Sequence, residues 1–234
     1  MDQLPITQWK GRLRVEFISR NGTAEAGFGD GVTKEFITEL SRNSFSEMYS
    51  LFLTSPSKCV YPNPAVGSAV ESPAQKYRFL GKLLGKAIYE GILVDIPFAR
   101  FFINLILGVP NNLMDLATLD VELYKNLMTL KNYTGDVQED FGLNFTIVDD
   151  VYGDYRVKEL IPGGANVEVT NKNRMQYIHA VFHYRLNVQV REHVAALREG
   201  LSELIHTHWL EMFSPQELQT LISGEDTDHA LDIA

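Results

Sequence analysis

The chain has 234 residues, 45% of them hydrophobic and 22% charged, which is the ordinary composition of a globular protein. A formal net charge of −9, without any cluster of Lys and Arg, argues against nucleic acid as the main partner. The longest apolar run, residues 96–107, is broken by Arg100 and Asn104, and no apolar signal segment opens the chain, so neither a membrane span nor secretion is expected. The single cysteine excludes an internal disulfide and is typical of reducing compartments, which predicts a cytoplasmic or nuclear location.

The first part of the chain is expected to contain short extended segments and one helix. Residues 1–10 form a polar lead-in, and alternating apolar and charged residues over 13–17 predict a strand. Glycine is frequent over 22–31, but the GxGxxG order of a phosphate-binding loop is missing. A helix is predicted over 33–43.

Ser72 and Pro73 predict the start of a longer helix over 74–91. Gly81 and Gly85 lie one turn apart on this helix. Each glycine costs about 1 kcal/mol relative to alanine inside a helix. We therefore expect the pair to permit the close approach of a second helix.

Two further helices are predicted from the residues at their ends. Pro97 suits the first turn of one helix, and Gly108 ends it. The residues between them are nearly all apolar, which indicates a central core helix. Asp120 is an N-cap candidate for the other helix, over 121–132, because its carboxylate can accept a free N–H of the first turn.

A hairpin is predicted next. Residues 141–145 alternate between apolar and small or polar types, which favours a strand, and 155–160 form its return partner after a polar turn at 149–154. One helix and one hairpin, over 112–160, are too thin to bury all of their apolar residues. The pattern therefore predicts an open apolar groove.

The stretch that follows combines a turn with an amphipathic helix. Pro162, Gly163 and Gly164 predict a turn with positive φ, and residues 166–169 predict another short strand. Thr170 is the predicted N-cap of the helix. Two apolar stripes run along that helix: Met175, Ile178, Phe182 and Leu186 on one face, and Tyr177, Val181 and Tyr184 beside it. Such a helix packs between layers, or packs with one face and binds with the other.

The last part is predicted to hold two helices. The first spans 188–205, with an apolar stripe at helical spacing. The second begins with a capping box, in which Ser214 is followed by Pro215 and Glu217, and ends at Gly224.

Five stretches, taken in order, resemble a known family. They are RVEFISRNGTAEAGFGDGVTKEF at 14–36, YPNP at 61–64, FLGKLLGKAIYEGILVDIPF at 79–98, ELIPGGANVEVTNKNRMQYI at 159–178, and ELQTLISG at 217–224. Together they resemble the N-lobe of a HECT-type ubiquitin ligase. No stretch of this chain resembles the C-lobe, which carries the nucleophilic cysteine in that family.

The resemblance implies an α+β, mostly helical fold: a HECT N-lobe with a large helical subdomain and a small inserted helix-plus-hairpin subdomain. On this basis residues 1–10 are a lead-in, and 11–111 with 161–224 form the large subdomain. Residues 112–160 form the small subdomain, which docks the ubiquitin-conjugating enzyme. Residues 225–234 begin the hinge to the C-lobe.

The resemblance also implies which residues contact the conjugating enzyme. They are Asn126, Leu127, Leu130, Tyr133, Phe141, Leu143, Tyr177 and Val181. Val181 replaces an aromatic residue that some relatives have. Spacing alone favours a simpler interpretation, in which Leu127, Leu130 and Phe141 pack only on one another.

The chemistry implied by the resemblance is ubiquitin transfer. A conjugating enzyme brings ubiquitin as a thioester, a C-lobe cysteine accepts it, and a substrate lysine receives it. This chain would supply docking and orientation, with no catalytic residue and no cofactor of its own. Its partners would be the conjugating enzyme, ubiquitin, and a protein substrate held by regions outside this chain. A truncated, non-catalytic module that sequesters conjugating enzymes is the alternative.

A histidine pair and the single cysteine are the other catalytic candidates. His179 and His183 have a spacing that can hold a metal, which keeps a metal hydrolase as a further alternative. Ala180 stands where zinc proteases carry Glu, so no metal site is expected. Cys59 lies beside Lys58 in an expected loop and is interpreted as a structural residue rather than a nucleophile.

Overall fold

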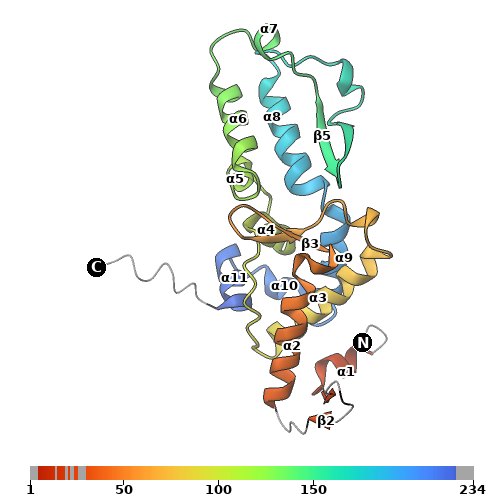
Figure 1. Cartoon of the computed structure of the whole chain (residues 1–234). Helices are drawn as coiled ribbons and strands as arrows, with labels where there is room; N and C mark the ends of the chain where they lie inside the picture. Colours follow the sequence, from red (N-terminus) through yellow and green to blue (C-terminus); the bar gives the residue numbers. More distant parts are fainter. Residues whose placement is uncertain (1–4, 14, 19–20, 22–23, 26–29, 225–234) are drawn as a thin grey trace, which may run out of the picture.

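A computed structural model of the chain describes residues 5–13, 15–18, 21, 24–25 and 30–224. It confirms the predicted α+β, mostly helical class, since the strands in this part of the chain form only separate two-stranded antiparallel sheets. Figure 1 shows two parts, one above the other. We call α6, α7, α8 and the β5–β6 hairpin the upper part, and the remaining elements, apart from those on the two segments that connect the parts, the lower part. Every described helix is too short or too polar to cross a lipid bilayer.

The lower part contains most of the helices. They are α1 (Ile6–Lys10), α2 (Asp30–Ser44), α3 (Pro73–Tyr89), α4 (Arg100–Leu107), α9 (Arg191–Ser202), α10 (Thr207–Leu210) and α11 (Pro215–Ser223). Its strands are β1 (Phe17–Ile18), β2 (Ala24–Glu25), β3 (Phe52–Thr54) and β4 (Val60–Pro62). Of the strand predicted over 13–17, only Phe17 is in a strand; residues 13, 15 and 16 are not, and residue 14 lies outside the described residues. The helix predicted over 33–43 is confirmed within α2. Residues 22–23 and 26–29 of the predicted glycine-rich loop lie outside the described residues.

The upper part contains three helices and one hairpin. They are α6 (Val121–Asn132), α7 (Val137–Phe141), α8 (Arg174–His183), β5 (Thr146–Val151) and β6 (Asp154–Glu159). A short helix, α5 (Leu116–Leu119), lies on the connection between α4 and α6. On the other side, a π turn, Tyr184–Val188, follows α8 and leads back to α9. The division of the chain into subdomains stays a prediction; Figure 1 adds that α8 stands beside α6.

The helix pair α3–α9 forms the centre of the lower part. A Cβ atom on Gly81 would lie 1.9 Å from the Leu197 carbonyl oxygen, and one on Gly200 would lie 1.8 Å from the Arg78 carbonyl oxygen. The two backbones are thus in direct contact, and each helix contributes a glycine to the crossing. The close approach predicted from Gly81 and Gly85 is confirmed.

The start of α4 differs from the sequence prediction. The helix begins at Arg100 rather than near Pro97, because residues 97–99 run beside β4 as extended chain. The Val60 N–H donates to the Pro97 carbonyl at 2.7 Å, and the Ala99 N–H donates to the Val60 carbonyl at 2.9 Å. These bonds with a distant segment hold the backbone out of the helical conformation. The predicted end at Gly108 is confirmed, with φ of 76°.

The hairpin of the upper part is shifted along the chain. Residues 141–145 do not form the predicted strand, since α7 extends to Phe141 and β5 begins at Thr146. The polar turn is also shorter than predicted, because it consists of Tyr152 and Gly153, both with positive φ. This is the backbone signature of a two-residue type I′ turn. The return strand predicted over 155–160 is confirmed as β6.

Two predictions before α8 are wrong. Residues 166–169 do not form a full strand: a 3-10 turn takes up Gly164–Asn166, and pairing is limited to one antiparallel bridge between Glu168 and Asn144. The chain turns around Phe145, whose N–H donates to the Gly164 and Val167 carbonyls at 3.0 and 3.2 Å. Thr170 does not cap the helix, which begins at Arg174. Asn173 is the reason: its side chain accepts the Thr170 N–H at 2.7 Å and donates to the Glu168 carbonyl at 2.9 Å, which stabilises a turn there.

Both helices predicted for the last part are present. The one expected over 188–205 is shorter, as α9: the π turn and a turn at 189–190 precede it, and it ends at Ser202. Before α11, Ser214 Oγ accepts the Glu217 N–H at 3.2 Å and Glu217 accepts the Ser214 N–H at 2.7 Å. The two bonds confirm the capping box, and the Ser214 N–H, followed by the Ser214 side chain, lowers the pKa of the Glu217 carboxyl.

Candidate docking groove

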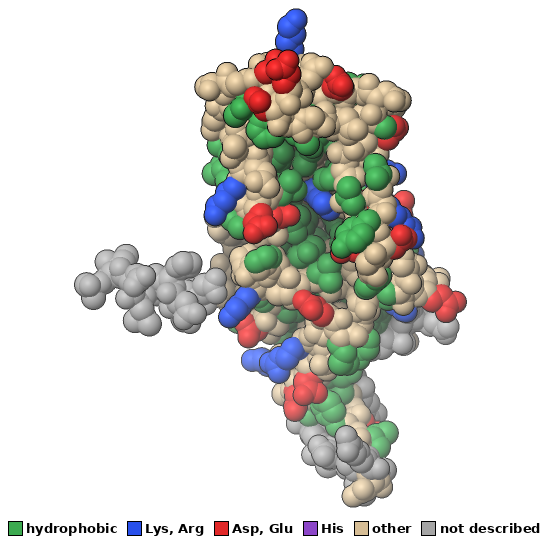
Figure 2. Space-filling view, turned by 45° about the horizontal axis from the view of Figure 1, so that its top comes forward, with side chains coloured by type: hydrophobic (Ala, Val, Ile, Leu, Met, Phe, Trp, Pro, Cys, Tyr) green, Lys and Arg blue, Asp and Glu red, His purple; other side chains and the backbone are tan. Residues whose placement is uncertain are grey.

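An apolar groove with a volume of about 260 Å³ opens between α6 and α8, next to the end of α7. It is lined by Leu123, Asn126, Leu127, Thr129, Leu130, Phe141, Leu143 and Tyr177. Figure 2 shows hydrophobic side chains gathered in the hollow of the upper part, with charged side chains around it. The upper part therefore leaves apolar surface open to solvent, as predicted from a helix and a hairpin that cannot bury all of their apolar residues.

Helix α6 supplies one wall of the groove. Asp120 caps it as predicted, since the carboxylate accepts the Leu123 N–H at 2.9 Å. Leu127 and Leu130, which are 4% and 2% exposed, form the floor. Asn126 and Thr129 are exposed and put an amide and a hydroxyl at the edge.

Phe141 is the most exposed apolar residue of the groove, at 38%. It ends α7, whose first N–H groups are accepted by Asp136, and Gly142 follows it with φ of 57°. The Tyr133 ring packs edge-on against Phe141, with 4.8 Å between ring centroids. Tyr133 in turn donates its hydroxyl to Asp140 at 2.7 Å, a bond that raises the pKa of Tyr133. The exposed Phe141 ring is thus held in place by a side chain that is itself hydrogen-bonded.

Tyr177 on α8 supplies the opposite wall. It is 9% exposed, and its burial raises the pKa of the hydroxyl. The ring packs edge-on against Phe145, with centroids 5.5 Å apart. Phe145 is held by the turn at Gly164, where a Cβ atom would lie only 2.4 Å from the Phe145 carbonyl oxygen. The two glycines predicted to form a turn have separate reasons, since Gly163 has φ of 72° and Gly164 permits this close approach.

The loop between α6 and α7 is bonded to the turn before α8. Asn171 accepts the Val137 N–H and donates to the Gly135 carbonyl, both at 3.1 Å. Arg174 donates to the Tyr133 carbonyl. These bonds set the distance between the two walls, so the groove has a defined width.

Six of the eight predicted contact residues line this groove. The other two differ: Tyr133 supports Phe141 from behind, and Val181 is 1% exposed and lies among the buried residues. Leu123 and Thr129 line the groove without having been predicted. Leu123 shares the helical face of Leu127 and Leu130, which was a readable signal, whereas an exposed threonine gives none. An apolar floor with polar edges is suited to binding rather than to bond making.

The metal alternative gains no third ligand in the structure. The His179 and His183 rings are nearly parallel, with centroids 5.8 Å apart. Burial, followed by the His179 and Arg191 charges, lowers the pKa of His183. Across residues 5–13, 15–18, 21, 24–25 and 30–224 there is no group of three His, Cys, Asp or Glu side chains that could hold a metal. Cys59 is half-buried and packs against the core, and its structural role stays a prediction.

The chain belongs to the HECT-domain (ubiquitin-transferase) family, whose sequence profile matches residues 38–234. Among curated proteins, it is 43% identical to a probable E3 ubiquitin protein ligase of Schizosaccharomyces pombe, over 92% of this chain and 21% of that protein. It is 42% identical to the human Ubiquitin-protein ligase E3B, over 97% of this chain and 22% of that protein. An E3 ubiquitin-protein ligase of Arabidopsis thaliana is 42% identical, with 96% and 22% covered. The chain thus spans about a fifth of the length of these relatives.

Proposed function

We propose that this chain is part of a HECT-type E3 ubiquitin-protein transferase and that its groove docks a ubiquitin-conjugating enzyme. Membership of the HECT family supports the reaction class. The observation that carries the docking role is the groove itself, which gathers Leu127, Leu130, Phe141, Leu143 and Tyr177 from separate segments around one opening.

In this proposal the chain contributes position rather than a reacting group. The docked enzyme carries ubiquitin as a thioester, and a cysteine of a C-lobe outside this chain attacks that thioester before a substrate lysine takes ubiquitin. The groove lining offers no thiol, imidazole or carboxylate. Its role is to raise the effective concentration of the thioester near the acceptor. The cytoplasm or nucleus, where such a reaction has its substrates, is the proposed location.

The size of the groove suits a contact that forms and breaks repeatedly. A cleft of about 260 Å³ with one exposed aromatic side chain offers a single anchor point rather than an extended interface. Small interfaces of this kind are weak and transient. A conjugating enzyme that must leave after each transfer requires this property.

The test is a titration of the isotope-labelled chain with a panel of ubiquitin-conjugating enzymes, followed by NMR. We expect shifts at residues 123–143 and at Tyr177. A Phe141→Ala variant should bind at least about 10-fold more weakly, because an aromatic side chain that the partner buries carries much of the binding energy of such an interface. Tyr155→Ala is the matched control, since Tyr155 is an exposed aromatic of the same part, 71% exposed on β6. Binding that maps elsewhere, or that both variants weaken equally, refutes the docking role.

A further inference from the structure

The chain passes between the upper and lower parts along two segments. One is the connection 108–120, which carries α5, and the other is the π turn Tyr184–Val188. A π turn is a rare element that is frequent at functional sites. The angle between the two parts therefore depends on what holds these two segments.

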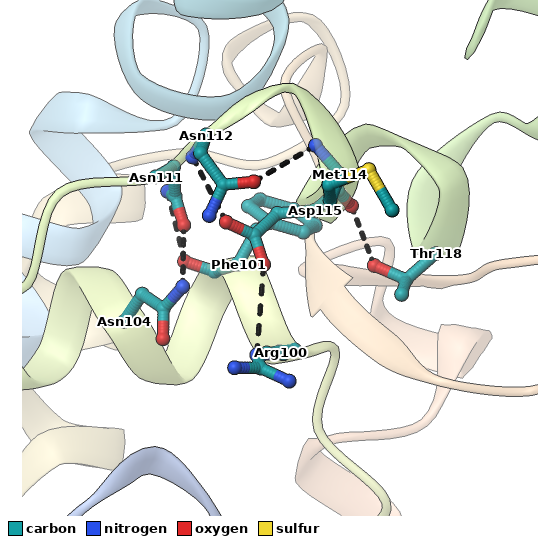
Figure 3. Close-up of polar contacts among 8 residues, drawn as sticks. All are labelled: Arg100, Phe101, Asn104, Asn111, Asn112, Met114, Asp115 and Thr118. Carbon is teal, nitrogen blue, oxygen red and sulfur yellow. Dashed lines mark hydrogen bonds and ion pairs between the residues drawn. The ribbon is translucent and has the colours of Figure 1, made fainter.

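Asn111 bonds the two segments to each other and to α4. Its side-chain amide donates to the Phe101 carbonyl at 3.1 Å, and towards Asn187 Oδ1 and the Leu186 carbonyl of the π turn at 3.3 and 3.5 Å. Its side-chain oxygen, Oδ1, accepts from the Asn104 side-chain amide at 2.9 Å. Figure 3 shows Asn111 directed at Asn104 and Phe101 on α4. One side chain thus joins both segments to the lower part.

Close by, the first segment has a second attachment to α4. Asp115 is 4% exposed, and its carboxylate lies 3.6 Å from Arg100 Nε. The same carboxylate accepts the Asn112 N–H at 2.9 Å (Figure 3). The residues that directly follow Asn111 are therefore held in position, which helps to present its amide to the π turn.

Asp149, on strand β5 of the hairpin, bonds the hairpin to the second connecting segment as Asn111 bonds the first. Its carboxylate accepts from three residues of the second segment and its C-terminal end: the Tyr184 hydroxyl, Gln189 Nε2 at 2.8 Å and Arg185 Nη1 at 3.5 Å. Arg185 also donates to the Val148 carbonyl at 3.2 Å. Each of these bonds between strand β5 and the π turn or its C-terminal end thus involves at least one side chain.

Side chains do not fill all of the space between the hairpin and the lower part. A cavity of about 280 Å³ lies between the hairpin and the lower part, lined on one side by Val148 and Asp150 and on the other by Tyr61, Asn63 and Phe101. Across it, Asn63 donates to the Tyr152 hydroxyl at the hairpin tip, at 2.9 Å. Since the space is not filled by side chains, directional polar bonds have to define the angle.

We propose that Asn111 and Asp149 are positioning residues that hold the docking groove at one angle to the lower part. This rests on the proposed function, because the angle determines where a docked conjugating enzyme presents its thioester. Neither side chain lines the groove. Loss of either one changes the angle of presentation and leaves the affinity of the groove for its partner within about 2-fold.

The experiment measures that angle in the whole chain without a partner. In a Cys59→Ser background, nitroxide labels on Lys76→Cys in α3 and Lys131→Cys in α6, both exposed, report the distance between the parts by pulsed electron spin resonance. We expect one narrow distance distribution for the parent, and a shift or broadening of several ångströms for Asp149→Ala and Asn111→Ala. Asp149→Asn keeps an acceptor for Tyr184 and Gln189 and is expected to restore most of the narrow distribution.

The matched control is Asp154→Ala, which removes the same charge from the same hairpin where Asp154 pairs only locally with Arg156. Distributions of Asp149→Ala and Asn111→Ala that equal this control overturn the proposal. So does a loss of conjugating-enzyme affinity as large as that of Phe141→Ala, since the residues would then shape the groove. The distance measurement contains no partner, so changed distances with no binding to any conjugating enzyme refute the proposed function and not the angle-setting role.

Discussion

Two helix pairs of this molecule meet in opposite ways. In the lower part, α3 and α9 cross with backbone against backbone, and glycines at 81 and 200 remove the side chains that would separate them. In the upper part, α6 and α8 stand apart, and leucines from one and Tyr177 from the other line the space between. The first pair packs closely because glycines replace larger side chains at the crossing. The second pair leaves apolar side chains exposed in the groove between its helices.

The difference separates stability from recognition. A closely packed helix pair is stabilised by all of its contacts but leaves no apolar surface exposed for a partner to cover. An open pair gives up part of that gain and retains apolar surface that a partner can cover. The two pairs share one chain, so the closed one can stabilise the scaffold on which the open one is presented.

The largest effect is expected where the closed pair is opened. Gly200→Ala places a methyl group on the Arg78 carbonyl, and overpacking of this kind costs about 3 kcal/mol of unfolding free energy. Urea unfolding measures the loss. Gly31→Ala in α2 is the control, because a Cβ atom there meets nothing within 4 Å and is expected to stabilise by up to about 1 kcal/mol. Equal effects of the two substitutions would remove the distinction between the helix pairs.

A somewhat smaller loss is expected at the floor of the open pair. Leu127→Ala deletes a side chain that is 4% exposed, and such truncations cost about 2–5 kcal/mol, with the low end expected beside a groove into which neighbours can relax. Val121→Ala, on the same helix but 45% exposed, should stay within about 0.5 kcal/mol. The same urea titration compares them. A cost below that of the control would show that the floor is not part of the cooperative core.

A large side chain that fills the groove should cover its apolar surface and so remove the site for a partner. Asn126→Trp puts an aromatic ring at the edge of the opening, and we expect it to lower affinity for a conjugating enzyme at least about 10-fold, which is about 1.4 kcal/mol. Stability should change by less than about 1 kcal/mol, since the site is exposed. Fluorescence titration and urea unfolding give the two numbers. Lys125→Trp, on the neighbouring exposed position, is expected to bind normally; equal weakening by both would argue against a specific groove.

The smallest effect is one of pH, and it is expected in the closed pair and not in the open one. His193 on α9 stacks on Tyr77 of α3 at 5.0 Å, and its burial lowers its pKa, against weaker opposite effects of Glu192 and the Pro64 carbonyl. Below the unfolded value of about 6.5 the unfolded state therefore binds more protons, so stability should fall as the pH drops from about 7 to 5. His193→Gln should flatten that slope and the exposed His208→Gln should not. Tyr177 has a raised pKa and stays neutral, so binding in the groove should not change between pH 6 and 8.

Sequence signals were reliable where the responsible interaction is local. The caps at Asp120 and Ser214 and the glycine at 108 act within one turn, and each was found where predicted. Pro97 misled because the competing bonds come from Val60, far away in the sequence. A pattern of apolar spacing contains no information about such a partner.

The groove could be predicted as a set of residues but not as a geometry. Phe141 and Leu143 line it although they were expected on a strand, and the former ends a helix instead. Asp136 followed by Glu139 is a helix-start signal that the prediction, based on alternation, did not use. Asn111 and Asp149 gave no signal, since single polar residues in an expected connection and turn look the same whether or not they join two parts of a molecule.

The hairpin has a consequence for how the protein behaves at high concentration. Every residue of β6 is exposed, and the strand is paired on one side only, with β5. Tyr155 and Val157 alone would make this outer strand a template for another chain to extend the sheet. Arg156 and Lys158 alternate with them, and Asp154 and Glu159 end the strand. Charged side chains on an edge strand oppose its pairing with another chain. The open edge of this hairpin is therefore blunted by charge rather than by a covering element.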